Sequence, residues 1–272
     1  MILVTGTMRS GTSMWMQVLI AAGFEFIGDA FPEPWGETLR PANPRGFFES
    51  QLVSGVYHGT NPHPESGAYL FPQQTRRHVV KVFIPGLIKT DVAFVDHVVV
   101  TVREWRQMAA SVQRMKSLPG PGEPGRMEMA VPAALLWWME NFALVRDIAT
   151  RRYAAHVTTY RRLLDDPERE VGMVLKWLGK GKRGPAVRAV DPQLMTQGNS
   201  APTPDYVEPG HAQIFDELYD AIHRGLDLTP AFVNQLNQTD RELRPRLEAI
   251  REGVRTDLVR RLAAAAPGGA RA

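Results

Sequence analysis

The sequence predicts an α/β protein with a central, mostly parallel β-sheet flanked by helices, and three stretches predict this class. The chain opens with a short apolar, β-branched run that passes through a turn into an apolar helical pattern, over residues 2–22. Residues 79–85 are expected to form a buried strand. Residues 97–103 form the strongest strand, since five of the seven are β-branched, and a helical pattern follows them. Strands separated by helices favour a parallel sheet.

The opening strand, loop and helix form a P-loop-like unit that is suited to bind an anion. Backbone N–H groups of the turn and of the first helical turn have no partners within the helix, and the helix dipole adds about half a positive charge there. We therefore expect an anion to lie on Ser10, Gly11, Thr12 and Ser13. The alternative is an ordinary strand-to-helix turn that binds no ligand.

Residues 6–13 nearly match the Walker A pattern of nucleoside triphosphatases. Thr12 replaces the lysine of that pattern, and a cation lies instead within the loop, at Arg9. A protein without that lysine is poorly equipped to hold a triphosphate. A single tetrahedral anion, held by backbone amides, hydroxyls and the planar guanidinium of Arg9, fits the sequence better.

Length and composition narrow the classes further. The 272 residues, of which 44% are hydrophobic, suffice for one large α/β domain. Lys and Arg total 32 against 29 for Asp and Glu, so the net charge of +3 does not indicate a nucleic-acid-binding protein. The chain has no cysteine, which excludes disulfides and thiolate metal sites. Because neither a signal-peptide pattern nor an apolar run of about 18 residues occurs, we expect a cytoplasmic protein without a membrane span.

Two loops rich in Gly, Pro and polar residues follow the first helix, over residues 24–44 and 57–74. Long loops in compact domains are usually functional. The first loop contains Glu33, the second contains His58, and Glu49 lies between them. These three side chains are therefore candidates for acid–base chemistry.

Lys81 lies in the middle of the strand expected over residues 79–85. A buried ammonium group is unfavourable unless it is paired. Either Lys81 lies on a face that opens toward an anion, which we favour, or the strand is at the edge of the sheet and the lysine is in water.

The strand over residues 97–103 ends in Arg103. In open α/β sheets, ligands bind outside the carboxyl ends of the strands, where the loop of Arg9 is also expected. A Walker B strand would end in an aspartate that holds Mg²⁺. A cation in that place predicts a site that binds anions directly and without a metal.

The rest of the chain is predicted to be mostly helical. Residues 119–125 (PGPGEPG) form a linker that is placed to act as a lid, and residues 131–148 form a long core helix. We divide the chain into an α/β core (1–210), a helical extension packed on the same domain (211–266) and a disordered tail (267–272).

The opening loop and the segment that begins at Arg103 resemble the sulfotransferase superfamily. Residues 9–13 resemble its 5′-phosphosulfate loop, and Arg103 with Ser111, eight residues later, resembles its 3′-phosphate pair. The resemblance implies a P-loop-like α/β fold that binds 3′-phosphoadenosine 5′-phosphosulfate (PAPS) without a metal ion. A serine eight residues after the arginine lies about two turns along the next helix, so both side chains are expected to reach one phosphate.

Further short motifs follow in the same order over residues 1–195, as in a bacterial branch of the superfamily. Residues 80–82 resemble the strand in which many members carry a lysine near the transferred sulfuryl group, here Lys81. Residues 157–167 resemble the element whose tyrosine, here Tyr160, lies by the adenine. Three other stretches, which cover residues 43–49, 174–179 and 190–194, also resemble that branch.

Four residues depart from the family pattern. Phe83 occupies the position at which many cytosolic members have a histidine base. Thr196 and Gln197 stand where the bacterial branch commonly has an arginine, so the outer grip on the 3′-phosphate is in question. Arg161 follows Tyr160 where the family has an acidic residue.

The resemblance implies an in-line transfer to a hydroxyl or amine, in which positioning and electrostatic stabilisation dominate. Arg9, Lys81 and the amides of residues 11–13 would stabilise charge on the leaving 5′-phosphate, and Arg103 and Ser111 would bind the 3′-phosphate. Tyr160 and Trp15 would lie near the adenine; the alternative for Trp15 is burial in the core face of the first helix.

The acceptor must also lose a proton to a base. Without the histidine, Glu33 is the first choice, because its apolar neighbours Phe31 and Trp35 would raise its pKa. Glu49 is the second choice and His58 the third.

Two other classes stay open. One is a P-loop kinase of a small molecule, which Thr12 and Arg103 disfavour; the other is a non-catalytic nucleotide- or anion-binding protein, which Phe83 makes credible. The acceptor, whether a sugar, a lipid, a peptide or a small metabolite, and the oligomeric state are not predicted.

Overall fold

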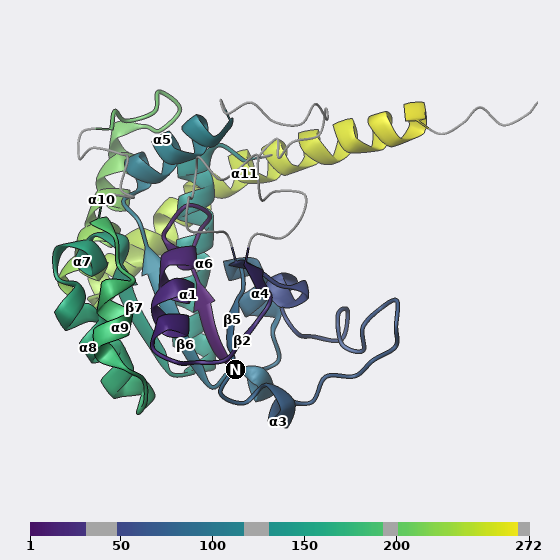
Figure 1. The fold of residues 1–272 in the computed structure, drawn as a ribbon. Helices are drawn as coiled ribbons and strands as arrows, with labels where there is room; N and C mark the ends of the chain where they lie inside the picture. Colours follow the sequence, from purple (N-terminus) through teal and green to yellow (C-terminus); the bar gives the residue numbers. More distant parts are fainter. Residues whose placement is uncertain (31–47, 117–130, 193–200, 266–272) are drawn as a thin grey trace, which may run out of the picture.

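The central sheet organises the molecule (Figure 1). A computed structural model describes residues 1–30, 48–116, 131–192 and 201–265. Within these ranges five parallel strands lie in the order β2 (Phe26–Ile27), β5 (Val79–Lys81), β1 (Ile2–Thr5), β6 (His97–Val102) and β7 (Ala155–Thr159). The predicted α/β class with a central, mostly parallel sheet is therefore confirmed.

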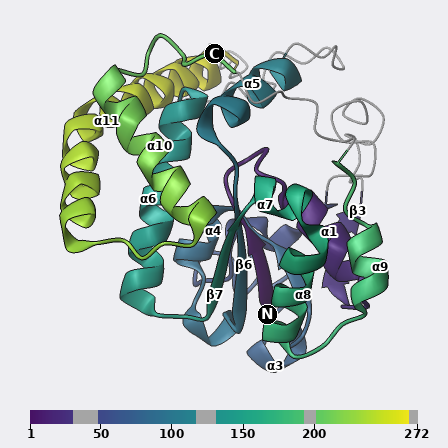
Figure 2. The same ribbon diagram turned by 90° about the vertical axis from the view of Figure 1, so that its left-hand side faces the viewer.

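The strands separate two hydrophobic clusters, because successive side chains of a strand point to opposite faces. In β1, Ile2 and Val4 belong to one cluster and Leu3 to the other. The first cluster is covered by α1 (Thr12–Ala21), α8 (Pro167–Leu178) and α9 (Arg183–Arg188), and the second by α4 (Ile84–Lys89) and α6 (Ala133–Arg151). Figure 2 shows the resulting three layers.

The strand expected over residues 79–85 is shorter than predicted. It ends at Lys81, and α4 begins at Ile84 with Pro85 in its first turn. Proline is favoured there because its missing N–H has no helical partner to lose and its fixed φ suits the helix. The helix therefore begins where the sequence analysis still placed a strand.

Shorter elements complete the two faces of the sheet. They are the antiparallel pair β3 (Asp29–Ala30) and β4 (Phe48–Glu49), the turns η2 (Gln51–Ser54) and η3 (Val92–Phe94), and the helices α3 (Pro72–Thr75) and α7 (Tyr160–Asp165). β4 places Glu49 beside the main sheet.

Three further helices pack on the same face of the sheet as α4 and α6. The helix α5 (Trp105–Lys116) follows β6 and lies above the carboxyl ends of the strands in both views (Figures 1 and 2). The helices α10 (Pro209–Arg224) and α11 (Pro230–Ala265) share the cluster of α6 through six buried side chains, Ala212, Phe215, Leu218, Leu236, Leu243 and Leu247. None of the helices in the described ranges combines the length and apolar character that crossing a bilayer requires.

The long helix α6 carries a carboxyl group whose titration is expected to affect stability. Burial raises the pKa of Glu140 from 4.5 to about 7. The folded protein therefore retains a proton that the unfolded chain releases between these pH values, so stability falls as pH rises through this interval and the loss is complete above it. The loss amounts to at most about 3 kcal/mol.

We predict that Glu140→Gln removes this pH dependence. Urea unfolding at about pH 5 and about pH 8 should show a larger fall in the free energy of unfolding for the wild type than for the variant, because glutamine cannot ionise. Glu65→Gln, at an exposed carboxylate, is the matched control and should behave like the wild type. An unchanged pH dependence in Glu140→Gln would contradict the prediction.

Candidate anion-binding site

The loop between β1 and α1 has a backbone that only certain residues can adopt. Arg9 and Gly11 have positive φ angles, of 63° and 100°. A Cβ atom at Gly11 would lie 2.4 Å from Cδ2 of Tyr160, and one at Gly6 would lie 2.3 Å from the carbonyl oxygen of Thr101. Glycine is needed at both positions because a side chain would clash with β6 at Gly6 and with the ring of Tyr160 at Gly11.

A hydrogen bond from β6 holds the loop, and the backbone amides of the loop lie at the start of α1. The hydroxyl of Thr101 donates a hydrogen bond to the carbonyl oxygen of Ser10, over 3.1 Å. Ser10 is fully buried and its hydroxyl packs beneath Gly6, so Ser10 is placed to offer its backbone, not its side chain, to a ligand. Thr12 is also buried, whereas Gly11 and Ser13 are partly exposed at the start of α1, whose first turn holds no acidic residue.

Two predicted arginines meet at this loop. Arg103, directly after β6, is 6% exposed, and its Nη1 donates to the carbonyl oxygen of Arg9 over 3.2 Å. The Nε of Arg9 in turn donates to Oγ of Ser111 over 3.1 Å. Ser111 thus contacts Arg9, and its binding of a phosphate together with Arg103 stays a prediction.

Two aromatic side chains, Tyr160 and Trp137, contact Arg103. The guanidinium of Arg103 lies over the ring of Tyr160, 5.1 Å from its centroid, and its carbonyl oxygen accepts a hydrogen bond of 2.7 Å from Nε1 of Trp137. Tyr160, the first residue of α7, therefore contacts both Arg103 and Gly11. Trp15 is fully buried in the cluster beneath α1, the alternative considered for it, and is not in a position to contact a ligand.

Burial and neighbouring positive charges lower the pKa values of the guanidinium groups at this site. The pKa of Arg9 falls to about 10, mainly through burial and then through the charges of Arg103 and Arg114. Burial also lowers the pKa of Arg103, and Arg114 adds to this effect. The buried Nε of Arg103 has no hydrogen-bond partner among the described residues. An anion bound here would relieve the repulsion between these cations.

Lys81 lies one strand away and has its own counter-ion. It is 5% exposed at the end of β5, between β1 and β2, which rules out the edge strand with a solvated lysine. Its Nζ lies 2.5 Å from Oε1 of Glu49. Burial lowers the pKa of Lys81, while Glu49 opposes that shift. The charge of Arg9 also acts on Lys81, so this ion pair borders the arginine group.

The remaining predicted residues fall outside this group. Glu33, the lid of residues 119–125, and Thr196 and Gln197 lie outside the described residues. His58 packs on Tyr57 and lines a different pocket with Lys89 and Asp91. In the described ranges no three His, Cys, Asp or Glu side chains gather as metal ligands would.

One cation near the site, Arg114, was not predicted from the sequence. Arg114 acts on both Arg9 and Arg103 and lies three residues after Ser111 on α5. The sequence contained the signal, because side chains three residues apart on a helix are neighbours.

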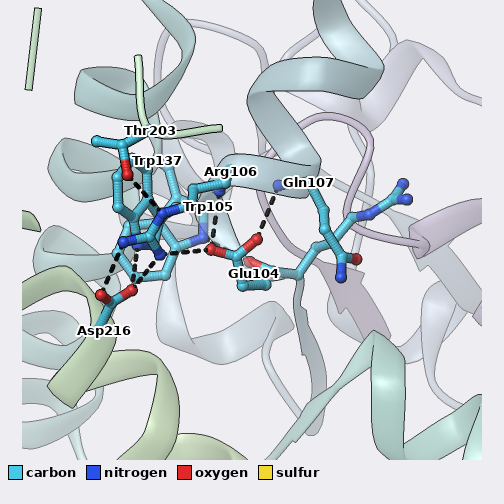
Figure 3. A network of polar contacts seen from close by, with 8 residues as sticks. Glu104, Trp105, Arg106, Gln107, Trp137, Thr203 and Asp216 are labelled. Atoms are coloured by element: carbon cyan, nitrogen blue, oxygen red, sulfur yellow. Dashed lines mark hydrogen bonds and ion pairs between the residues drawn. The ribbon is translucent and has the colours of Figure 1, made fainter. Parts of the chain in front are cut away.

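The sequence analysis also missed the polar network that fixes the start of α5 (Figure 3). Glu104 accepts hydrogen bonds from the backbone N–H groups of Arg106 and Gln107, over 3.0 and 2.8 Å. Asp216 of α10 accepts from both terminal nitrogens of Arg106 and, over 2.8 Å, from Nε1 of the fully buried Trp105. Asp216 lies 110 residues from Arg106, so no local pattern could reveal the pair.

The fold is similar to solved structures of other proteins. No family model and no curated protein matches the sequence. The solved structures that match include the sulfotransferase domain of an olefin synthase from Synechococcus PCC 7002, which is 14% identical, with 89% of this chain and 94% of that chain covered at a TM-score of 0.42. They also include the sulfotransferase domain of the curacin biosynthetic pathway, which is 14% identical, with 89% and 96% covered at a TM-score of 0.37.

We predict that Asp216→Ala lowers the free energy of unfolding by about 1–3 kcal/mol, because it leaves the buried Nε1 of Trp105 without an acceptor. Asp216→Asn should lose less, since its amide oxygen can still accept. Urea unfolding of both variants measures the effect, and Asp220→Ala, in an exposed pair with Arg224, is the control. Equal stability of Asp216→Ala and the wild type would contradict the role assigned to the network.

Proposed function

We propose that this protein is a sulfotransferase that uses PAPS as the donor and a hydroxyl or amine as the acceptor. The observation that carries the proposal is the convergence of Arg9, Arg103 and Ser111 on the opening loop, with a third cation, Lys81, beside them. These residues come from the segments whose motifs resemble the sulfotransferase superfamily.

The two ends of the donor would occupy different parts of this site. The amides of Gly11, Thr12 and Ser13, at the start of α1, suit the 5′-phosphosulfate, because helix N-termini favour anions. Arg103 and Ser111 suit the 3′-phosphate, and Tyr160 offers an aromatic surface to the adenine. PAPS supplies an activated sulfuryl group, and the protein supplies its position.

Charge develops on the leaving 5′-phosphate during an in-line displacement. Arg9 and Lys81 are placed to stabilise it, and both are already desolvated, which strengthens their effect. Glu49 holds Lys81 in place and favours its protonated form. Glu33 is retained as the proposed base toward the acceptor, with Glu49 as the second choice.

A binding experiment tests the donor site. We predict that adenosine 3′,5′-bisphosphate stabilises the wild type against heat, by about 2.7 kcal/mol at a ligand concentration about 100 times the Kd. Arg103→Ala should bind roughly 10- to 100-fold more weakly in calorimetry, since it loses a charged hydrogen-bond donor. Arg244→Ala, at an exposed arginine on α11, is the control. If the wild type shows no protection, the proposal is wrong.

Activity variants test the chemistry. With PAPS and a panel of hydroxyl and amine acceptors, Lys81→Met should lower kcat by about 100-fold or more, because it removes charge stabilisation from the transition state. Glu49→Gln should lower it less and Glu33→Gln strongly, if Glu33 is the base. Full activity in both carboxylate variants would contradict a carboxylate base, and nucleotide binding without transfer to any acceptor would indicate a non-catalytic protein.

A further inference from the structure

Phe83 is an exposed aromatic residue between two buried neighbours. It is 38% exposed, whereas Val82 and Ile84 are 1% and 0% exposed. Its backbone is fixed, because its N–H donates a hydrogen bond of 3.1 Å to the carbonyl oxygen of Val53 and the residue caps the start of α4. The side chain makes no capping hydrogen bond. The backbone of Phe83 therefore serves the fold, while its ring is presented to the solvent from a fixed point.

The ring of Phe83 lies beside the ammonium group of Lys81. The Nζ atom of Lys81 is 5.4 Å from the centroid of the ring. The register of the sheet places Lys81 opposite Val4 of β1, and the N–H of Val82 donates to the carbonyl oxygen of Val4 over 3.0 Å. β1 ends at Thr5 and leads directly into the loop of the candidate anion site. Lys81 and Phe83 therefore lie next to that loop, on the side of β5.

The chemistry of this ring limits what it can contribute to the site. A phenyl ring has no atom that takes up a proton, so Phe83 cannot serve as a base toward an acceptor. It favours contact with apolar surface, because such contact removes both surfaces from water. A polyol would instead lose hydrogen bonds to water where it met the ring. An exposed ring beside Lys81 is therefore suited to an acceptor with a hydrocarbon skeleton.

We propose that Phe83 is a specificity-determining residue that contacts the carbon skeleton of the acceptor, and that the acceptor is a hydrophobic alcohol or amine. This inference rests on the proposed function, in which Lys81 stabilises charge at the reacting centre. It narrows the class of acceptor, because the ring of Phe83 selects for an apolar skeleton next to the reacting group and disfavours polyols.

A chain-length series tests this role. With PAPS as the donor, kcat/KM is measured for linear primary alcohols and amines, from propyl to octyl, on the wild type, Phe83→Ala, Phe83→Leu and the exposed control Leu226→Ala. In the wild type and the control, kcat/KM should rise by up to about fourfold per methylene group that is buried. Phe83→Ala should roughly halve this factor, and Phe83→Leu should keep most of it, since leucine is also apolar. The factor compares acceptors on one protein, so a general loss of active enzyme does not change it.

The outcomes separate the inference from the proposed function. An unchanged rise per methylene in Phe83→Ala would overturn the inference and leave the proposed function standing. The absence of a rise in the wild type, or a preference of the wild type for erythritol over butanol, would do the same. A loss of affinity for adenosine 3′,5′-bisphosphate in Phe83→Ala would also overturn it, because the ring would then support the donor site. A wild type that transfers a sulfuryl group to none of these acceptors would contradict both.

Discussion

The candidate site depends on the hydrogen bond from Arg103 to the carbonyl oxygen of Arg9, which joins the end of β6 to the opening loop. β1 and β6 are paired in the sheet, so their carboxyl ends lie side by side and this contact spans a short gap. Trp137 holds the carbonyl oxygen of Arg103 from the other side. Both arginines therefore lie next to the carboxyl ends of paired strands and are joined by a hydrogen bond.

The protein treats its buried cations in two ways. Lys81 has a carboxylate partner 2.5 Å away, so its charge is largely compensated within the protein. Burial lowers the pKa of Arg9 and of Arg103; the charges of Arg103 and Arg114 add to the shift of Arg9, and the charge of Arg114 adds to the shift of Arg103.

The C-terminal helices take part in the architecture of the site. Asp216 of α10 is bound to Trp105 and Arg106 at the start of α5, and His223 of α10 lies 2.9 Å from the hydroxyl of Thr159 at the end of β7. The helix that carries Ser111 and Arg114 is thus fixed by residues from a distant part of the chain. Substitutions in α10 that break these contacts should therefore change the position of α5 at the candidate anion site, although α10 contributes none of the predicted ligands.

The sequence by itself determined the class of fold, the opening strand–loop–helix, the strand that directly precedes Arg103, and most of the cationic residues of the site, because alternation, β-branching and glycine act over a few neighbouring residues. It also contained the spacing that relates Ser111 to Arg114. Only the tertiary structure decided that Glu49 pairs with Lys81, that Ser111 meets Arg9, that Trp15 is buried and that Asp216 holds α5. Those contacts join residues far apart in the chain, and their formation depends on how the layers pack, which no local pattern records.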